Sequence, residues 1–119
     1  MEKIGFIGTG VMGSSMIKHL LNAGYPVRVY NRTKSRADAV VSEGAVWCDT
    51  PAAVTAQSDI VITMVGYPKD VEETYFGESG IFSKADDHHI LIDMTTSTPT
   101  LARKIAAFGK ESGVRTLDA

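Results

Sequence analysis

Three glycines near the start of the chain restrict its fold more than any other feature. Gly8, Gly10 and Gly13 have the spacing G-x-G-x-x-G, and they follow a short apolar run, Ile4–Ile7, that is typical of a buried strand. Apolar residues then recur at helical spacing, at Met12, Met16, Ile17, Leu20 and Leu21. A strand, this turn and a helix in succession favour a dinucleotide-binding turn over an ordinary structural turn.

Each glycine has a distinct role in such a turn. Gly8 allows the chain to turn tightly, Gly10 lets the backbone approach a pyrophosphate, and Gly13 lets the helix lie close to the strand. The helix that begins here also directs unpaired N–H groups and the positive end of its dipole towards bound phosphates. We therefore expect a dinucleotide site at this turn.

The composition narrows the classes of partner. A length of 119 residues suits one domain, so we expect residues 1–119 to form a single dinucleotide-binding domain. The formal net charge is −2, and the sequence has neither a basic stripe nor an apolar run of membrane-spanning length, which argues against nucleic-acid and membrane partners. The single cysteine, Cys48, excludes an internal disulfide, and the first strand follows Met1 too closely for a signal peptide. We expect a cytoplasmic protein.

Strands and helices alternate along the chain. The predicted strands are Ile4–Ile7, Val27–Tyr30, Ala45–Trp47, Asp59–Val65, Ile90–Met94 and Val114–Leu117. The predicted helices run from the glycine turn to Asn22, over Lys34–Ser42, Pro51–Gln57 and Pro68–Phe76, and from Pro99 to Ser112. Alternation with short connections predicts an α/β fold, a Rossmann doubly wound parallel sheet with strand order 3-2-1-4-5-6.

Capping residues and burial patterns give further expectations. Glycines are expected to end three helices, at Gly24, Gly44 and Gly113, and threonines to cap two others, at Thr33 and Thr50. The fourth strand is almost continuously apolar, which is typical of a strand covered on both faces. The residues expected to face inward from the helices include Val40, Val41, Leu101, Ile105 and Phe108.

The end of the second strand indicates which dinucleotide is bound. NAD-selective domains carry a carboxylate there that binds the ribose hydroxyls, whereas this chain reads Asn31-Arg32-Thr33-Lys34. Arg32 can pair with a 2′-phosphate through two hydrogen bonds, and Asn31 and Thr33 can donate to it. The alternative is a solvated polar turn that caps the next helix, and Thr33 can serve both purposes. We favour NADP(H) over NAD(H) as the cofactor.

Two more segments lie where ligands bind in open α/β sheets, beyond the carboxyl ends of the strands. Met64, Val65 and Gly66 follow the fourth strand, and Gly66 would let the backbone lie against the nicotinamide ribose. Thr96 follows the fifth strand and offers a hydroxyl to that ribose or to the carboxamide. The alternative for Thr95–Thr98 is a polar cap for the following helix, and the residues alone do not choose between these two roles for Thr96.

The histidines suggest no metal site. His88 and His89 follow Asp86 and Asp87, but adjacent residues at a strand entrance point apart, so we expect a solvated loop over residues 77–89. The spacings of zinc ligands are absent from the sequence, as is the G-x-S-x-G motif of nucleophilic hydrolases.

Several stretches together resemble the N-terminal domain of the β-hydroxyacid dehydrogenases, which include 3-hydroxyisobutyrate dehydrogenase, tartronate semialdehyde reductase and 6-phosphogluconate dehydrogenase. The matching stretches are Gly5–Gly13, Asn31–Thr33, Ile92–Pro99 and Leu117–Ala119, and the resemblance extends over the whole chain. The 3-hydroxyisobutyrate dehydrogenase-like branch is the most similar. Where many relatives have Leu-Pro after the fourth strand, this chain has Val65-Gly66.

The resemblance implies roles for individual residues. Val11 and Met12 would contact the dinucleotide, Asn31, Arg32 and Thr33 the adenosine ribose or its phosphate, and Thr96 the nicotinamide end. In the family, a Pro-Val-Ser-Gly-Gly segment follows Asp-Ala and helps to bind substrate, and a helical C-terminal domain supplies a lysine as general acid/base. No lysine of this chain matches that position, so we assign no catalytic residue.

The resemblance therefore predicts the cofactor domain of a longer oxidoreductase that moves a hydride between a nicotinamide and a small β-hydroxyacid or semialdehyde. We expect the 119-residue chain alone to be inactive, and we expect homo-oligomers. A different class of function is a non-catalytic dinucleotide-sensing or interaction module. A downstream Ser-Gly-Gly and a helical lysine in the full reading frame would favour the enzyme over the module.

Overall fold

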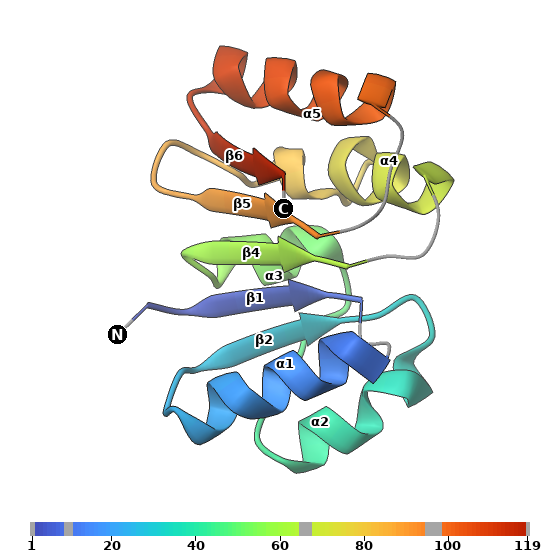
Figure 1. Ribbon diagram of the computed structural model, residues 1–119, viewed down its shortest axis with the longest axis vertical. Helices are drawn as coiled ribbons and strands as arrows, with labels where there is room; N and C mark the ends of the chain where they lie inside the picture. Colours follow the sequence, from blue (N-terminus) through green and yellow to red (C-terminus); the bar gives the residue numbers. More distant parts are fainter. Residues whose placement is uncertain (1, 9–10, 65–67, 95–98, 119) are drawn as a thin grey trace.

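The computed structural model describes residues 2–8, 11–64, 68–94 and 99–118, which form a parallel sheet flanked by helices (Figure 1). The strands are β1 (Ile4–Ile7), β2 (Val27–Tyr30), β3 (Val46–Trp47), β4 (Ile60–Thr63), β5 (Ile90–Asp93) and β6 (Arg115–Asp118). Their order is β3-β2-β1-β4-β5-β6, and all neighbouring strands are parallel. The predicted fold class and strand order are confirmed.

The helices are α1 (Val11–Asn22), α2 (Asp38–Ser42), α3 (Pro51–Ala56), α4 (Pro68–Phe76) and α5 (Pro99–Ser112). Two 3₁₀ turns, η1 (Lys34–Ala37) and η2 (Ile81–Ser83), complete the described elements. The α-helix predicted over Lys34–Ser42 is wrong in its first half, which is η1. Among the described residues, none of the helices is both long and apolar enough to cross a membrane.

The predicted glycine caps are confirmed, but only one of the two threonine caps is. Gly24, Gly44 and Gly113 have φ angles of 92°, 121° and 75°, the left-handed conformation that ends a helix without strain only at glycine. The Thr50 hydroxyl accepts a hydrogen bond from the Ala53 N–H at 3.0 Å, at the start of α3. Thr33 makes no side-chain cap, because its carbonyl rather than its hydroxyl accepts the Arg36 N–H at 3.1 Å.

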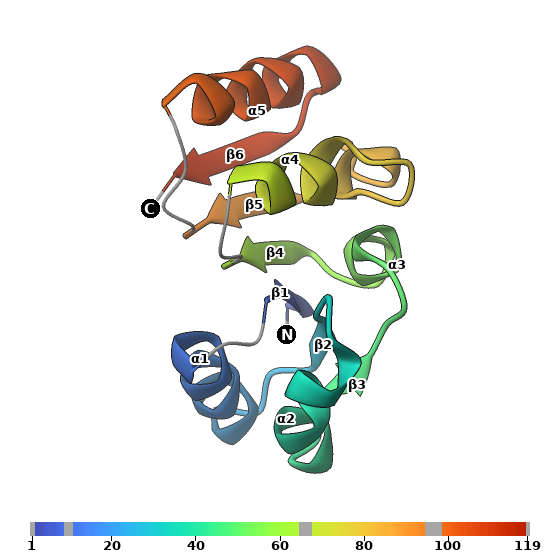
Figure 2. The same ribbon diagram turned by 90° about the vertical axis from the view of Figure 1, so that its right-hand side faces the viewer.

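Two apolar cores pack on the two faces of the sheet. Helices α1 and α2 cover one face, and α3 lies across the sheet from α1 (Figure 2). The residues buried under α1 and α2 are Ile4, Phe6, Ile17, Val27, Val29, Ala37, Val40 and Ala45. The opposite core joins strand residues to α3, α4, η2 and α5, through Ile7, Val54, Val61, Val71, Tyr75, Ile81, Leu91, Leu101 and Ile105. Burial of this apolar surface is the main force that holds the layers together.

Two side chains predicted to face inward are partly exposed. Val41 is 37% exposed and Phe108 is 39% exposed. Phe108 lies at the rim of the second core, where its ring centroid is 4.6 Å from that of Phe82 and 5.5 Å from that of Phe76. Aromatic stacking therefore retains Phe108 at the surface, where periodicity alone places it inside.

The two faces of the fourth strand are covered to different extents, with Ile60 and Ile62 packed only at the margin of the core under α1 and α2. Val61 is buried, whereas its neighbours Ile60 and Ile62 are half-buried. Helices α1 and α2 cover the β1–β2–β3 half of their face, and Figure 1 shows strands β4, β5 and β6 unobstructed on the same side. The register places five apolar residues together on this surface, which we call the open sheet face: Ile60, Ile62, Ile90, Ile92 and Leu117.

Candidate functional site

The glycine turn has the close packing that its sequence predicts. Gly8 has a φ of 97°, and its N–H donates to the Tyr30 carbonyl at 3.0 Å. A Cβ added to Gly13 would lie 2.7 Å from the Gly8 carbonyl oxygen and 3.2 Å from Cε1 of Phe6. Helix α1 therefore rests directly on the end of β1. Its first turn lies at the edge of the sheet where the strands end (Figure 1).

A cleft of about 650 Å³ opens beside this turn. Its walls come from the ends of β1 and β2, the start of α3, and α4 with the loop that follows it. Of the predicted site residues, Gly8, Asn31, Arg32 and Met64 line it. A volume of this size, at the carboxyl ends of parallel strands, is typical of cofactor and small-molecule sites.

Of the remaining predicted site residues, the structure places three in α1 and one in the loop after β2. Thr33 does not line the cleft. Val11 and Met12 form the first two positions of α1, and Gly13 packs against the turn as described above. Gly10, Val65, Gly66 and Thr96 fall outside the described residues.

The loop after β2 is held by one of the predicted ligands. The Asn31 side-chain amide donates to the Thr33 carbonyl at 2.8 Å, and the same carbonyl accepts the Arg36 N–H. Asn31 thus shapes the loop that carries Arg32. Beneath the loop, the ring of Tyr30 packs on Trp47 with centroids 5.7 Å apart.

Arg32 is paired with a carboxylate that the local sequence does not contain. Its Nη1 donates to Oδ1 of Asp70 on α4 at 3.0 Å, across 38 residues of sequence. The arginine side chain is 83% exposed and that of Asp70 is 23% exposed. Sequence reasoning missed Asp70 because only the fold brings the first turn of α4 to the end of β2.

The cleft is consequently of mixed charge. Arg32 and Arg36 lie on the wall formed by β2 and η1. Asp70, Glu73 and Glu78 lie on the facing wall. Opposite charges at close range attract each other and compete with any anionic ligand for the same cations.

A buried polar chain crosses the core just below the segments that follow β4 and β5. The Thr63 hydroxyl lies 2.9 Å from the Tyr75 hydroxyl and 3.1 Å from Oδ1 of Asp93. All three side chains are at least 95% buried. Because a carboxylate only accepts, the arrangement that satisfies each group has Tyr75 donating to Thr63 and Thr63 donating to Asp93. The chain links β4, α4 and β5 behind the cleft.

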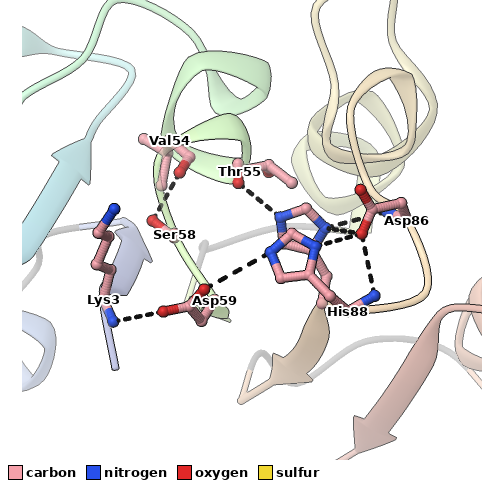
Figure 3. Close-up of polar contacts among 8 residues, drawn as sticks. Lys3, Val54, Thr55, Ser58, Asp59, Asp86 and His88 are labelled. Atoms are coloured by element: carbon pink, nitrogen blue, oxygen red, sulfur yellow. Dashed lines mark hydrogen bonds and ion pairs between the residues drawn. The ribbon is translucent and has the colours of Figure 1, made fainter. Parts of the chain in front are cut away.

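A second polar cluster occupies the opposite, amino-terminal edge of the sheet. Figure 3 shows the imidazole of His88 between the carboxylates of Asp59 and Asp86. The other Asp59 oxygen accepts the backbone N–H of Lys3 at 2.8 Å. The His88 backbone N–H donates to Asp86, and this hydrogen bond in particular holds the pKa of the Asp86 carboxyl below its usual value. These contacts join the entrances of β1, β4 and β5.

His89 was expected in a solvated loop, and this prediction is wrong. The side chain is 2% exposed, its Nδ1 accepts the Asp86 N–H at 3.0 Å, and its Nε2 donates to the Thr55 carbonyl at 2.7 Å. The rings of His88 and His89 also stack, with centroids 3.9 Å apart, instead of pointing apart. Asp86, His88 and His89 lie close enough together to hold a metal ion, but both nitrogens of His89 are already bonded to the backbone. The cluster therefore has a structural role, because its contacts join the loop before β5 to α3 and to the start of β4.

Comparison with known proteins agrees with this geometry. Residues 3–119 match the family model described as the NAD binding domain of 6-phosphogluconate dehydrogenase. The chain belongs to that family. The predicted resemblance is thereby confirmed, and the chain is a dinucleotide-binding domain whose relatives include 3-hydroxyisobutyrate dehydrogenase-like oxidoreductases.

The relatives with similar sequences are longer than this chain. It is 55% identical over 118 residues to the uncharacterized oxidoreductase YkwC of Bacillus subtilis, covering 99% of this chain and 41% of that protein. It is 48% identical over 118 residues to the Arabidopsis thaliana protein named Probable 3-hydroxyisobutyrate dehydrogenase-like 1, mitochondrial, covering 98% of this chain and 35% of that protein. The chain thus spans about two fifths of the length of the relatives it matches.

Solved structures show the same fold with either dinucleotide. The 3-hydroxyisobutyrate dehydrogenase of Mycobacterium tuberculosis, solved with L-serine, gives a TM-score of 0.89 at 28% identity, over 100% of this chain and 40% of that one. The imine reductase of Myxococcus stipitatus in complex with NADP⁺ gives 0.85 at 29% identity, over 98% and 39%. A variant of that reductase with NAD⁺ gives 0.86 at 28% identity, over 99% and 40%.

Proposed function

We propose that this domain binds NADP(H) in preference to NAD(H) for an oxidoreductase that moves a hydride between the nicotinamide and a small β-hydroxyacid or semialdehyde. The observation that carries the proposal is the glycine turn, where Gly8 and Gly13 bring α1 onto the end of β1 beside the cleft. The membership of the family of NAD-binding domains supports the same ligand class.

The residues present fit a dinucleotide. Side chains are absent at Gly8 and Gly13, and the first turn of α1 offers its N–H groups to a pyrophosphate. At the adenosine end, Arg32 offers guanidinium N–H groups to a 2′-phosphate, and Asn31 fixes the loop that presents them. A bound nicotinamide would supply the hydride chemistry, and this domain would hold and orient it.

The general acid/base belongs, in this proposal, to a second domain of the whole protein. The lysine that serves this role in the β-hydroxyacid dehydrogenases has no counterpart in residues 1–119. Substrate recognition and subunit association of the whole protein would also depend on that domain.

Calorimetry of the 119-residue chain tests the choice of cofactor. NADPH should bind more tightly than NADH, and Arg32→Ala should remove most of the difference, at a cost of about 1.5–3 kcal/mol for a hydrogen bond to a charged group. Arg115→Ala, at an exposed arginine on β6 outside the cleft lining, is the matched control. Equal affinities for the two cofactors in the unmodified chain would contradict the NADP(H) preference.

Turnover assays test the assignment of the catalytic group. We expect the isolated chain to reduce none of succinic, methylmalonic and tartronic semialdehyde with NADPH, and the full-length parent to reduce at least one. Activity in the isolated chain would place the acid/base group within residues 1–119.

A further inference from the structure

The ion pair between Arg32 and Asp70 lies at the cleft where the adenosine end of the cofactor is proposed to bind. Arg32 is the cation that favours a 2′-phosphate, and its Nη1 is already bonded to Asp70 at 3.0 Å. Both residues line the cleft. Asp70 would thus compete with a 2′-phosphate for Arg32, the residue on which the proposed NADP(H) preference rests.

We propose that Asp70 is a specificity-determining residue that lowers the affinity for NADP(H) by holding Arg32, and so brings the affinities for the two dinucleotides closer together. The inference rests on the proposed function, since it concerns the same cofactor site. NAD-selective domains have a carboxylate at the end of β2, and this chain has none there. Asp70 is a carboxylate near the same place, but it belongs to α4 and acts through its bond to Arg32.

The physical argument is one of competition between two anions. A 2′-phosphate carries nearly two negative charges at neutral pH and is bound best when a guanidinium gives it two parallel hydrogen bonds. To do so, Arg32 must weaken its bond to Asp70 or bring the phosphate against a carboxylate of like charge. Either step costs binding energy that NADH, with no 2′-phosphate, does not lose.

The burial of the two partners makes Asp70 the fixed member of the pair. Its side chain is 23% exposed and lies in the first turn of α4, where the helix dipole favours a negative charge. Arg32 is 83% exposed and reaches it from the loop after β2. The position of Asp70 therefore determines where the arginine rests before a cofactor arrives.

Variants that each remove one carboxylate of α4 distinguish the effect of the Arg32–Asp70 ion pair from the effect of the overall charge of the cleft. Asp70→Asn keeps the shape of the side chain and removes its charge. Glu73→Gln removes a more exposed carboxylate of the same helix that also lines the cleft. Glu72→Gln removes a carboxylate of α4 that pairs with Lys104 at 2.9 Å and does not line the cleft. Asp70→Ser repeats the removal with a different side chain in case the asparagine variant does not fold.

The experiment measures Kd for NADPH and NADH by calorimetry on the 119-residue chain and these variants, each checked for an unchanged circular dichroism spectrum. Asp70→Asn should tighten NADPH binding about threefold to tenfold, the range expected for breaking an exposed ion pair and relieving a like charge. The NADH affinity should stay within about twofold. Glu73→Gln should have a smaller effect on NADPH, and Glu72→Gln should have none.

The same change in an Arg32→Ala background tests whether Asp70 acts through the arginine. There, Asp70→Asn should raise the NADPH affinity clearly less than it does when Arg32 is present, because only the like-charge repulsion remains, and the difference is the coupling that a double-mutant cycle measures. An unchanged ratio of affinities in Asp70→Asn, an equal gain in Glu73→Gln, or a gain of the same size without Arg32 would each overturn the inference while leaving the proposed function intact. Failure of the unmodified chain to bind either dinucleotide would instead contradict the proposed function, and the inference with it.

Discussion

The hydroxyl of Thr63 on β4 lies 3.1 Å from Oδ1 of Asp93 on β5, and both side chains are buried. Each residue is the last of its strand, and the two strands pair in parallel at these positions. The contact therefore fixes the level at which two adjacent strands end, directly before the segments that carry Met64 and Thr96.

Replacement of this hydroxyl should be costly for stability. Thr63→Val keeps the shape of the side chain but removes the donor to a buried carboxylate, so we expect a loss of about 1–3 kcal/mol in the free energy of unfolding. Urea denaturation followed by circular dichroism measures it. Thr55→Val is the matched control, because that buried hydroxyl bonds to the Pro51 carbonyl within its own helix. Equal losses in the two variants would show that the Asp93 contact has no special weight.

Gly13→Ala should disturb the contact between α1 and β1. The added methyl group would lie 2.7 Å from the Gly8 carbonyl oxygen, a backbone atom that cannot move alone. We expect a loss of about 1–3 kcal/mol of stability from overpacking, together with weaker dinucleotide binding. Thermal unfolding and calorimetry check both effects. Ser15→Ala, at an exposed position of the same helix, should change stability by no more than about 0.5 kcal/mol, and an equally small effect at Gly13 would refute the predicted close packing.

Cys48 should be slow to react in the folded chain. Burial raises the pKa of its thiol above the ordinary value of 9.0, and the charge of Arg28 opposes this only in part. The protonated form is thus favoured in the folded state. The resulting contribution to stability is present in full below pH 9.0 and is lost as the pH rises through the raised pKa.

A thiol-specific disulfide reagent at pH 8 provides the measurement. Its rate with the native chain should be well below its rate with the chain unfolded in urea. Equal rates would mean that Cys48 is accessible and its pKa is not raised by burial.

The open sheet face should cause the isolated chain to associate. Leu117 is 58% exposed and lies beside Ile92, which is half-buried. Exposed apolar surface of this kind promotes association, so size-exclusion chromatography should show dimers or larger species at high concentration. Leu117→Lys should shift the population towards monomers, whereas Val41→Lys, at a partly exposed residue of α2, should not. A chain that is monomeric at all concentrations would contradict this expectation.

The elements whose signals are local in sequence were predicted well. Ile4–Ile7, Val27–Tyr30 and Pro68–Phe76 have the predicted bounds, since each combines a clear apolar pattern with flanking glycine or proline. The left-handed glycine at position 8 and the tight contact at Gly13 follow from the motif itself. These features depend on residues within a few positions of one another.

The features that were missed depend on contacts between distant residues. Asp70 contacts Arg32 only because the fold brings α4 beside the end of β2, and His89 is bonded in the core to the Thr55 carbonyl of α3. The 3₁₀ turn at Lys34–Ala37 is a separate departure, since it lies where the sequence predicted the first half of an α-helix. Local sequence patterns do not indicate contacts between residues that are far apart in the chain. The fold and the glycine turn were therefore predictable, but the charge balance of the cleft was not.

The central place of β1 has a consequence for how the chain folds. Ile4 pairs with Val27 on one side and with Ile60 on the other, so β1 completes its hydrogen bonds only with a strand far along the chain. Parallel pairing across such a separation requires closure of a long loop and is slow compared with the formation of local turns and helices. During synthesis, the strand that leads into the glycine turn must therefore remain half-paired until residues 60–63 have been made.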